Sequence, residues 1–371
     1  MIWYMIGLIL FLGLFSGFFF LWKLPLIPLT ANSERVPPLS IIIPARNEEL
    51  SLPALLKSIQ QQSIEPLEVI VVDDESTDNT AHIAEEFGAT VLSASSANLS
   101  QKGKSAACWM GAQKAKGDWL VFLDSDTRFV HRDALRSIAD VYLKKNQNGL
   151  FSIQPFHETE KAYETISVVL NIMVMAGLNR FSLLKDKLPH RGAFGPFLLT
   201  TRLQYEKSGG HQVILDSHMD DIELARLYKS KNWPVSVYGG KGSIHFRMFP
   251  EGISQLVNGW TKSLLQGAEG THPLVHLSIG MWITGVIMIS ILVILSVVYY
   301  SSLLAVLLSL CAYLLYCFQF RWLMNKVGRF PLWTMVFPFF FVIAFIGLYI
   351  WAFVQVHIIK KVKWRGRDIK T

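Results

Sequence analysis

The sequence predicts an α/β domain built on a parallel sheet, joined to helices that enter a membrane. Apolar, strand-like runs alternate with helix-like stretches over residues 39–144, and this alternation is typical of a parallel sheet with crossover helices. Hydrophobic residues make up 51% of the 371 residues, which is high for a soluble protein, and the excess is clustered in a few segments. The length therefore allows two domains, or one domain together with membrane spans.

The start of the chain is expected to form a membrane anchor. Residues 1–22 carry no charge and are long enough to cross a bilayer, which needs about 20 apolar residues. A positively charged start and a small-residue cleavage site, both features of a secretory signal peptide, are missing. We therefore expect an uncleaved anchor, followed by a linker over residues 23–38 that ends in Pro37 and Pro38.

Four strands and four helices are expected in the segment that follows. The β-branched residues of Val69–Val72 suit a strand that is buried on both faces of the sheet. The first helix has apolar residues at helical spacing, at Leu52, Leu55, Leu56 and Ile59. The strands are expected at 39–43, 69–72, 90–92 and 119–123, and the helices at 50–62, 80–87, 105–115 and 134–144.

More apolar segments lie in the second half of the chain. Residues 277–320 are long enough for two membrane spans with a break near 299–302. Residues 330–359 form one more candidate, which contains Pro331 and Pro338. We expect membrane helices over 275–359, a basic tail over 360–371, and a short helix near 166–178 that lies in the membrane interface.

Charge and cysteine content exclude some classes of protein. The net charge of +7 comes largely from basic clusters beside apolar segments, so nucleic acid is not an expected partner. The basic tail favours contact with anionic membrane lipid, and the alternative is a tail that is only solvated. The three cysteines, Cys108, Cys311 and Cys317, have no metal-binding spacing and fit a reduced compartment without a disulfide framework.

Polar clusters follow three of the expected strands. They are residues 44–48, 73–78 and 124–126, and the carboxyl ends of parallel strands are where ligands of such sheets bind. Asp124 and Asp126 are two residues apart, so in an extended segment both carboxylates face the same side. Such a pair suits Mg²⁺ or Mn²⁺ shared with the diphosphate of a nucleotide sugar. Lys104, at the start of an expected helix, indicates a nearby anion, or else it is an exposed loop lysine.

The segments IIIPARNEE, VVDDESTDNT, GKSAACWMGAQKAKGDWLVFLDSD and MDDIELA resemble the family-two inverting glycosyltransferases, which have the GT-A fold. The resemblance covers residues 39–272 and implies a Rossmann-like nucleotide-binding sheet. It implies that Asp124 and Asp126 hold the metal and the diphosphate of a UDP-sugar. The residues that it implies around the uridine and phosphates are Pro44, Arg46, Glu48, Asp73, Asp74 and Lys104.

A narrower resemblance extends over nearly the whole chain. FSIQPFH, GAFGPFLLTT and FRMFPEGISQLVNGWTKSLLQGAEGTHP are similar to membrane glycosyltransferases of the 4,4'-diaponeurosporenoate type. This resemblance implies transfer of glucose from UDP-glucose to the carboxyl group of a C30 carotenoid acid dissolved in the membrane. The alternatives are glycosylation of a lipid hydroxyl (diacylglycerol, hopanoid or sphingoid), a polysaccharide synthase, and a non-catalytic membrane protein.

The resemblance places the acceptor chemistry at Asp221, with Asp220 beside it. Asp221 is expected to remove the acceptor proton in a single displacement that inverts the anomeric centre. The other interpretation is that both aspartates cap a helix. A carboxylic acid acceptor is already ionised at neutral pH, since its pKa is about 4–5. The presence of Asp221 therefore favours a lipid hydroxyl as the acceptor. Alternatively, Asp221 orients the acceptor or holds a carboxyl proton whose pKa is raised by an apolar site.

The segment QLVNGW stands where many chain-extending relatives have Gln-x-x-Arg-Trp. Gly259 replaces the arginine, and this departure argues against a polysaccharide synthase. Gln255 and Trp260 are expected on the acceptor side, Trp260 either stacking on a sugar or lipid or serving as an interfacial anchor. Lys262 is expected to neutralise the leaving diphosphate, unless it is simply solvated.

Three further residues complete the expected site. His245 is a candidate third metal ligand, although a lone histidine is as often structural. Arg247 is a candidate for phosphate contact, and Gly195 for close approach of the backbone to the acceptor.

The expected location is the cell membrane, with several spans and the catalytic domain on the cytoplasmic side, where nucleotide sugars are found. Three spans after the domain would export the basic tail, against the positive-inside tendency. We therefore expect one of the apolar segments to be interfacial or re-entrant.

Overall fold

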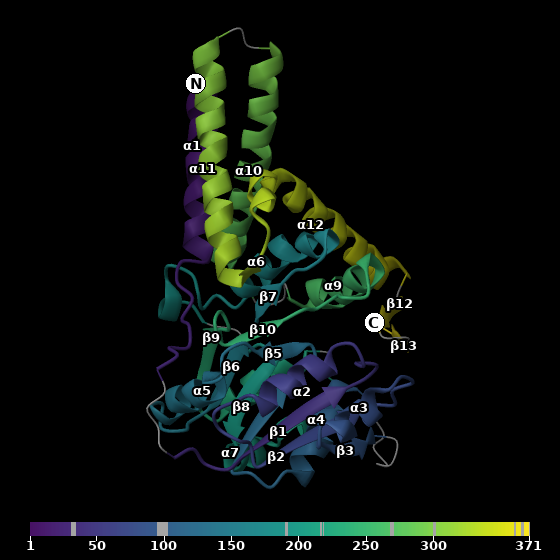
Figure 1. Cartoon of the computed structure of the whole chain (residues 1–371). Helices are drawn as coiled ribbons and strands as arrows, with labels where there is room; N and C mark the ends of the chain where they lie inside the picture. The colour runs from purple at the N-terminus through teal and green to yellow at the C-terminus, as the bar shows by residue number, and fades with distance from the viewer. Residues whose placement is uncertain are drawn as a thin grey trace. The chain divides into compact units, whose positions relative to one another are not determined.

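The structure is a computed structural model that describes residues 1–30, 35–94, 103–189, 192–215, 217, 219–267, 271–299, 302–359, 361–364 and 367–370. The chain forms two compact units, and each is described by itself (Figure 1). The sheet unit contains residues 25–156 and 192–248. The helical unit contains residues 1–24, 157–191 and 249–371.

The sheet unit is built on a seven-stranded sheet with the order β3-β2-β1-β4-β8-β6-β9. Strands β3, β2, β1 and β4 are parallel neighbours, β8 is antiparallel to both β4 and β6, and β9 is parallel to β6. The strands are β1 (Leu39–Ala45), β2 (Glu68–Asp73), β3 (Thr90–Ser93), β4 (Trp119–Leu123), β5 (Thr127–Phe129), β6 (Leu150–Gln154), β8 (Phe197–Thr201), β9 (Val235–Gly239) and β10 (Ile244–Phe246). The helices are α2 (Leu52–Gln60), α3 (Thr80–Glu86), α4 (Lys104–Lys114), α5 (Ala134–Leu143), α7 (Arg202–Ser208), η4 (Gly210–Ile214) and α8 (Asp220–Ser230).

The expected strands and helices of residues 39–144 are confirmed as β1 to β4 and α2 to α5. The sheet as a whole is mixed and not purely parallel, because β8 enters between β4 and β6 in the opposite direction. Apolar β8 could not be distinguished by periodicity from a strand of either direction, since a buried strand is apolar on both faces.

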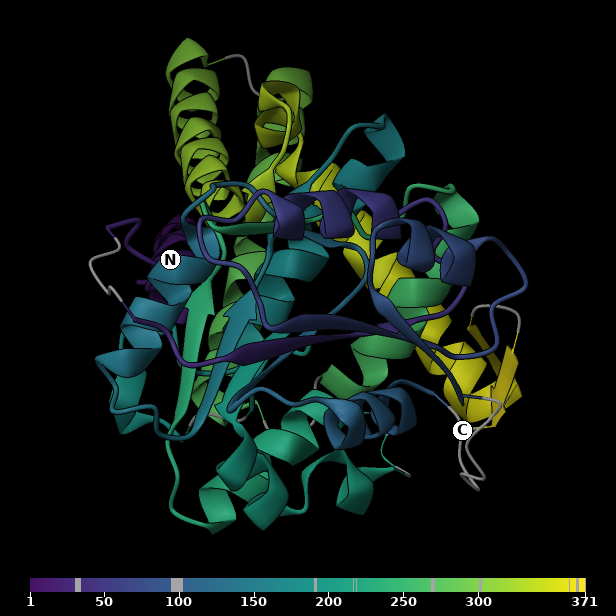
Figure 2. The ribbon, with the colours of Figure 1, turned by 60° about the horizontal axis from the view of Figure 1, so that its bottom comes forward.

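Alternate residues of β1 pack on opposite faces of the sheet. Ile41 and Ile43 belong to the core cluster that also contains Leu52 and Leu55 of α2. Ile42 faces α4, where a Cβ on Gly111 would lie 2.5 Å from the Cγ2 atom of Ile42. Helices therefore cover both faces (Figure 2), and the polar segments are left at the carboxyl ends of the strands.

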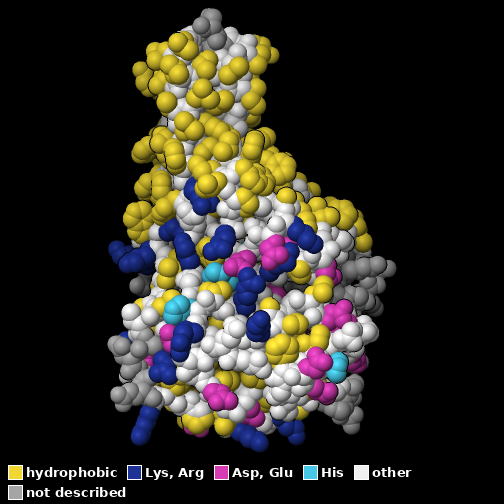
Figure 3. All heavy atoms as spheres, in the orientation of Figure 1, with side chains coloured by type: hydrophobic (Ala, Val, Ile, Leu, Met, Phe, Trp, Pro, Cys, Tyr) yellow, Lys and Arg dark blue, Asp and Glu magenta, His cyan; other side chains and the backbone are white. Residues whose placement is uncertain are grey.

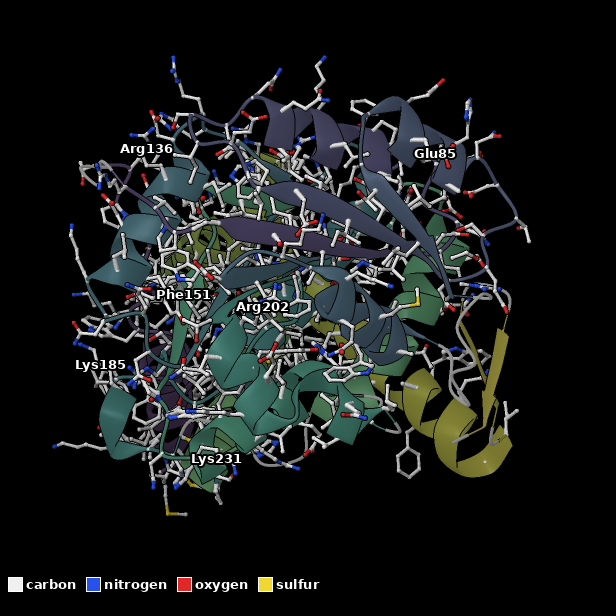
Figure 4. The ribbon with its side chains drawn as sticks, turned by 90° about the horizontal axis from the view of Figure 1, so that it is seen from below. Glu85, Arg136, Phe151, Lys185, Arg202 and Lys231 are labelled. Carbon is white, nitrogen blue, oxygen red and sulfur yellow. The ribbon has the colours of Figure 1, made fainter. Side chains whose placement is uncertain are left out.

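The start of α7 fixes the turn before β4. The side chain of Arg202, labelled in Figure 4, donates from Nε and Nη2 to the carbonyl oxygen of Gly117 at 3.0 and 2.8 Å. The backbone N–H of Arg202 also donates to the carbonyl of Asp118. A short antiparallel pair, β5 with β10, sets His245 opposite Arg128 and Phe246 opposite Thr127.

The helical unit consists mainly of apolar helices. Its principal helices are α1 (Ile2–Phe20), α6 (Ser167–Gly177), α9 (Ile253–Gly267), α10 (Pro273–Tyr299), α11 (Leu303–Val327) and α12 (Pro338–Phe353). Its shorter helical segments are η2 (Ala162–Ile166), η3 (Lys185–Lys187), η5 (Leu332–Val336) and η6 (Val354–Ile359). Strand β7 (Phe156–Glu158) pairs within this unit with β11 (Gly328–Arg329) through His157 and Glu158, and β12 (Lys361–Trp364) pairs with β13 (Arg367–Lys370).

In the described part of the chain, α1, α10 and α11 are long and apolar enough to cross a membrane. The expected break near 299–302 is confirmed as a break between two helices, because α10 ends at Tyr299 and α11 begins at Leu303. The candidate at 330–359 is divided at its prolines, and α12 has only 16 residues. The short apolar helix expected near 166–178 is present as α6.

The predicted catalytic domain over 39–272 remains a prediction, and the compact units divide the chain differently. Residues 157–191 and 249–272 group with the apolar helices, because α6 and α9 both pack against α12. The apolar surface of these helices is buried within the helical unit.

Buried polar side chains join the three long helices. Gln319 of α11, 2% exposed, donates from Nε2 to the carbonyl of Leu14, and its Oε1 accepts from the indole N–H of Trp282 at 3.0 Å. Tyr316 donates to the carbonyl of Leu10 at 2.7 Å. Figures 1 and 3 show these helices side by side with an outer surface of hydrophobic side chains. Polar side chains between apolar helices thus have hydrogen-bonding partners.

Candidate functional site

The loops that follow β1 and β2 are joined by hydrogen bonds. Arg46, two residues after Pro44, donates from Nη1 to the carbonyl oxygens of Asp74 and Glu75, the latter at 3.1 Å. The backbone N–H of Asp74 donates to the carbonyl of Ala45 at 2.8 Å. The expected uridine-binding residues after these two strands therefore lie together at one edge of the sheet.

Glu48 and Asp73, at the same edge of the sheet, are also held by hydrogen bonds. Buried Glu48 donates its backbone N–H to Thr80 Oγ1 at 2.7 Å, and Asp73 Oδ1 accepts from the N–H of Ser76 at 3.2 Å. Asp73 also pairs with Ala45 across the parallel strands. The two loops thus form one preorganised polar surface, although their contact with uridine stays a prediction.

The turn that carries Asp124 and Asp126 is held by backbone contacts. The N–H of Asp124 donates to the carbonyl of Pro196 at 3.0 Å, and the carbonyl of Asp124 accepts from the N–H and hydroxyl of Thr127. The carbonyl of Asp126 accepts from the N–H of Arg247 at 3.2 Å. Residues 124–126 are therefore fixed between the ends of β8 and β10, and the backbone of Arg247 lies beside Asp126. Contact of the Arg247 side chain with phosphate stays a prediction.

Lys104 is the first residue of α4, and it reaches the Asp124 carboxylate. Its Nζ lies 2.6 Å from Oδ1 of Asp124. Burial disfavours the charged ammonium, but the charges of Asp124 and Asp220 outweigh it and raise the pKa of Lys104 well above its ordinary value. The group is therefore a permanent cation. Gly103 precedes it with a φ of 116°, a conformation that favours glycine.

Asp221 lies in the first turn of α8 and faces the same volume. Its Oδ2 accepts from the N–H of Gly195 at 3.0 Å, and its Oδ1 accepts from the N–H of Ile222 at 2.8 Å. A Cβ on Gly195 would lie 3.0 Å from Nζ of Lys104 and 3.4 Å from Oδ2 of Asp221. Gly195 therefore leaves room for the side chains of Lys104 and Asp221 to approach each other.

The surroundings of Asp221 make its carboxylate basic. Burial and the neighbouring charge of Asp220 raise the pKa of Asp221 to about 6, against the opposing effects of Lys104 and two backbone hydrogen bonds. The group is ionised at neutral pH and takes up a proton at slightly lower pH. Helix α8 begins at Asp220, and the Asp221 carboxylate accepts from the N–H of Ile222 in its first turn, so helix capping by Asp221 is compatible with a role in the site.

The residues fit a metal ion that is shared with a substrate. Asp124 and Asp126 offer hard carboxylate oxygens, and Mg²⁺ is commonly held by one or two carboxylates together with substrate phosphates. Among the residues that the structure describes, no group of three acidic, histidine or cysteine side chains could hold a metal alone. The donor set thus suits a site completed by diphosphate oxygens.

His245 is buried on β10, the strand that pairs with β5 directly after Asp124 and Asp126. Its Nε2 accepts from the N–H of Gly242 at 3.4 Å, and its ring packs against Phe156 with the centroids 5.1 Å apart. These contacts describe a well-packed side chain, and its role as a metal ligand stays a prediction.

The expected residues of the QLVNGW segment belong to α9 in the helical unit. Gln255 forms hydrogen bonds with Glu251 one turn earlier. Trp260 is 2% exposed, and its indole N–H donates to Ser167 Oγ at 3.0 Å. In this structure, Trp260 therefore packs inside the unit, and stacking on an acceptor stays a prediction. The side chain of Lys262 lies outside the described residues.

The structure explains the glycine that replaces arginine before Trp260. A Cβ on Gly259 would lie 2.4 Å from Cε1 of Phe249, and the Phe249 ring also contacts Trp260 with the centroids 5.9 Å apart. The aromatic ring of Phe249 fills the space that a side chain at position 259 would need. An arginine there would require Phe249 to move.

Two supporting residues were not expected from the sequence. The carbonyl of Pro196 holds Asp124, and buried His211 lies behind the site, where its Nδ1 is 2.8 Å from the hydroxyl of Tyr205. Burial lowers the pKa of His211 to about 4, so the ring is neutral. The segment Gly209-Gly210-His211 is typical of a polar loop, and it does not show that the His211 ring is buried. The ring is buried because it contacts Tyr205 and Phe122.

Comparison with known proteins agrees with the resemblance. Residues 40–184 match the model described as Glycosyl transferase family 2. The chain is 38% identical over 331 residues to 4,4'-diaponeurosporenoate glycosyltransferase of Staphylococcus aureus strain MRSA252, which covers 89% of this chain and 88% of the relative. The protein of strain USA300 is similar to the same extent.

A solved structure has the same fold. The mannosyltransferase PcManGT from Pyrobaculum calidifontis, in complex with GDP-Man and Mn²⁺, has a TM-score of 0.54 and 16% sequence identity, with coverage of 93% of this chain and 98% of that chain. At this identity, the similarity shows a common fold alone. The α/β domain predicted from the alternating elements is thereby confirmed, and so is the GT-A fold that the resemblance implied.

Proposed function

The chain belongs to glycosyltransferase family 2, and from this premise we propose that it transfers glucose from UDP-glucose to the carboxyl group of a C30 carotenoid acid. The acceptor is supported by the printed activity of the relative, which is 38% identical over most of both chains. One observation supports the proposed chemistry. Four residues lie close together in the sheet unit, namely Lys104, Asp124, Gly195 and Asp221.

The donor is proposed to bind along the edge formed by the loops after β1, β2 and β4. The uridine lies against Arg46, Glu48, Asp73 and Asp74, whose loops are already joined in the free protein. Asp124 and Asp126 would hold Mg²⁺ or Mn²⁺ together with the diphosphate. This is supported by the solved mannosyltransferase structure of the same fold, which contains Mn²⁺. The bound ion would stabilise the negative charge that develops on the leaving UDP.

Transfer is proposed to be a single displacement with inversion. The acceptor oxygen attacks C1 of glucose while the bond from C1 to the diphosphate breaks, and UDP leaves toward Lys104 and Arg247. With an ionised carboxyl acceptor no proton has to be removed, so Asp221 is proposed to orient the acceptor, from the side opposite the diphosphate, through a proton shared between the two carboxylates, which its raised pKa favours. Asp220 maintains the basicity of Asp221 through its negative charge.

A lipid hydroxyl is the second candidate acceptor, and one observation favours it. A hydroxyl must lose its proton during attack, and a carboxylate with a pKa of about 6 is a suitable base at neutral pH. Diacylglycerols, hopanoids and sphingoid bases have such hydroxyls. A polysaccharide synthase is less favoured, since Phe249 fills the place beside Gly259.

The apolar helices are proposed to bring the enzyme to its acceptor in the membrane. Helices α1 and α11 end near Lys23 and Lys326, and α10 begins at that same end of the helical unit (Figure 1). Lys326 Nζ lies 3.7 Å from the centroid of the Trp322 ring and donates to the carbonyl of Trp22 at 2.6 Å. Aromatic and basic residues of this kind mark the cytoplasmic interface, where they contact anionic lipid.

This arrangement also accounts for the basic tail. Three spans, α1, α10 and α11, leave residues 23–272 and everything after Val327 on one side. Helix α12, with 16 residues, is proposed to lie in the interface, so the tail remains cytoplasmic with the catalytic residues.

The proposed reaction is tested by mass spectrometry of lipid extracts. Cells that express the chain together with candidate acceptors are expected to accumulate a hexosyl ester of the carotenoid acid, which mild base cleaves. A base-stable hexoside of a lipid hydroxyl would instead support the second candidate. Transfer by the purified protein is expected to stop in chelator and to resume with Mg²⁺ or Mn²⁺, and full activity in chelator would remove the metal from the proposal.

The proposed topology is tested with single cysteines in a protein whose three native cysteines are replaced by alanine. A membrane-impermeant maleimide is expected to label Ser302→Cys in intact cells. Lys370→Cys should react only after the cells are permeabilised. Labelling of Lys370→Cys in intact cells would mean that α12 crosses the membrane.

A further inference from the structure

Lys104 contacts the Asp124 carboxylate, which is proposed to hold the metal ion. Its Nζ is 2.6 Å from Oδ1 of Asp124, which is a direct contact between opposite charges. Both side chains retain more than a quarter of their surface exposed, at 29% and 28%, so the pair is accessible from solvent. A divalent cation at this carboxylate would meet the positive charge of the ammonium at close range.

The ammonium of Lys104 also lies close to the acceptor side. The position of a Cβ on Gly195 is 3.0 Å from Nζ of Lys104 and 3.3 Å from the Cβ of Asp221. Asp220, one residue earlier in α8, adds a further negative charge to the surroundings of Lys104. A single flexible cation therefore balances carboxylates from the donor turn and from the start of α8. Lysine suits such a position because its charge sits on a flexible stem of four carbons.

We propose that Lys104 changes partner when the donor binds. In the free enzyme it neutralises Asp124 in place of the metal ion, and in the donor complex it neutralises the diphosphate. This exchange rests on the proposed function, because it requires a metal-dependent UDP-sugar donor. Its consequence is an order of binding: the free protein holds a divalent cation weakly, and the cation enters together with the nucleotide, whose phosphates draw Lys104 away from Asp124.

The test measures Mn²⁺ binding to the full-length protein in detergent, without nucleotide, from the electron paramagnetic resonance signal of free Mn²⁺. Lys104→Gln is expected to bind Mn²⁺ at least about tenfold more tightly than the wild-type protein, since a neighbouring cation shifts the affinity of a carboxylate for a proton by a comparable factor. Lys114→Gln is the matched control: it removes the same charge from the other end of α4, at an exposed position. Lys104→Arg keeps the charge and should bind Mn²⁺ as weakly as the wild-type protein.

A second measurement separates an exchange of partners from simple repulsion. In saturating Mn²⁺, UDP is expected to bind Lys104→Gln at least about tenfold more weakly than it binds Lys114→Gln, because the diphosphate has lost its cation. If Lys104→Gln is not folded, as judged by circular dichroism, Lys104→Met takes its place in both measurements.

The outcomes are distinct. Tighter Mn²⁺ binding with weaker UDP binding supports the exchange. Mn²⁺ binding to Lys104→Gln that is no tighter than to Lys114→Gln overturns it, as does unchanged UDP affinity. If the wild-type protein binds UDP equally well with Mn²⁺ and with chelator, the metal dependence of the proposed function fails, and the exchange fails with it.

Discussion

The sheet unit and the helical unit satisfy their polar side chains differently. At the strand ends of the sheet unit, charges meet charges: Lys104 contacts Asp124, and Asp221 lies beside them with an elevated pKa. Between the long helices, neutral groups such as Gln319 meet backbone carbonyls and an indole N–H. Charges that are held close but incompletely neutralised can act on a substrate. Neutral hydrogen bonds between helices serve packing, so the two units should respond differently to substitution.

The largest effect is expected from Asp126→Asn in the sheet unit. Transfer should fall at least about a hundredfold, because the proposed metal ion and diphosphate would lose a charged ligand at the point where the leaving group develops charge. The melting temperature should stay near that of the wild-type protein. The rate of glucose transfer from labelled UDP-glucose measures the effect, and Asp118→Asn, an exposed aspartate before β4, is the control. Normal turnover by Asp126→Asn would remove the metal assignment.

A smaller loss of activity is expected from Asp221→Asn. With a carotenoid acid acceptor the rate should fall about tenfold, because Asp221 only orients an acceptor that is already ionised. With a lipid hydroxyl the loss should be about a hundredfold or more. In that case the wild-type rate should rise as pH increases through about 6, where Asp221 loses its proton, and the variant should lack this limb. The two pH profiles therefore identify the class of acceptor.

In the helical unit, Gln319→Leu should lower stability and leave activity unchanged. This substitution removes the bonds to Leu14 and Trp282 and leaves the buried indole N–H without its partner, so we expect a loss of stability of about 2 kcal/mol. Activity per folded molecule should be unchanged. Thermal unfolding in detergent gives the measurement, and Trp282→Phe combined with Gln319→Leu should recover part of the loss. A variant that is fully stable but inactive would contradict the distinction between the units.

The smallest effect is a pH-dependent gain in stability of Asp221→Asn. The folded-state pKa of Asp221 is raised from 3.8 to about 6, so its protonated form favours folding, and this contribution is lost as pH rises through about 6. Asparagine resembles the protonated form at every pH. The variant should therefore melt at a higher temperature than the wild-type protein at pH 8, and the difference should shrink toward pH 5. A difference that is independent of pH would contradict the burial of this charge.

Local patterns predicted much of the fold, and the family resemblance supplied the candidate residues of the site. Strands β1 to β4, the helices between them and the polar strand ends follow from periodicity and residue type, which are visible over a few residues. The direction of β8, the contact of Lys104 with Asp124, and the burial of Trp260 against Ser167 depend on residues far apart in the chain. A sequence pattern does not contain such partners. The glycine at 259 illustrates this, because its reason is the ring of Phe249.

The reversed direction of β8 has a consequence for engineering the enzyme. Just before this strand, Gly195 donates to the Asp221 carboxylate and the carbonyl of Pro196 accepts from Asp124, so a single stretch of main chain positions both carboxylates. Any insertion or loop exchange there would displace the proposed donor and acceptor groups together. Attempts to change the proposed acceptor should therefore leave residues 195–201 intact.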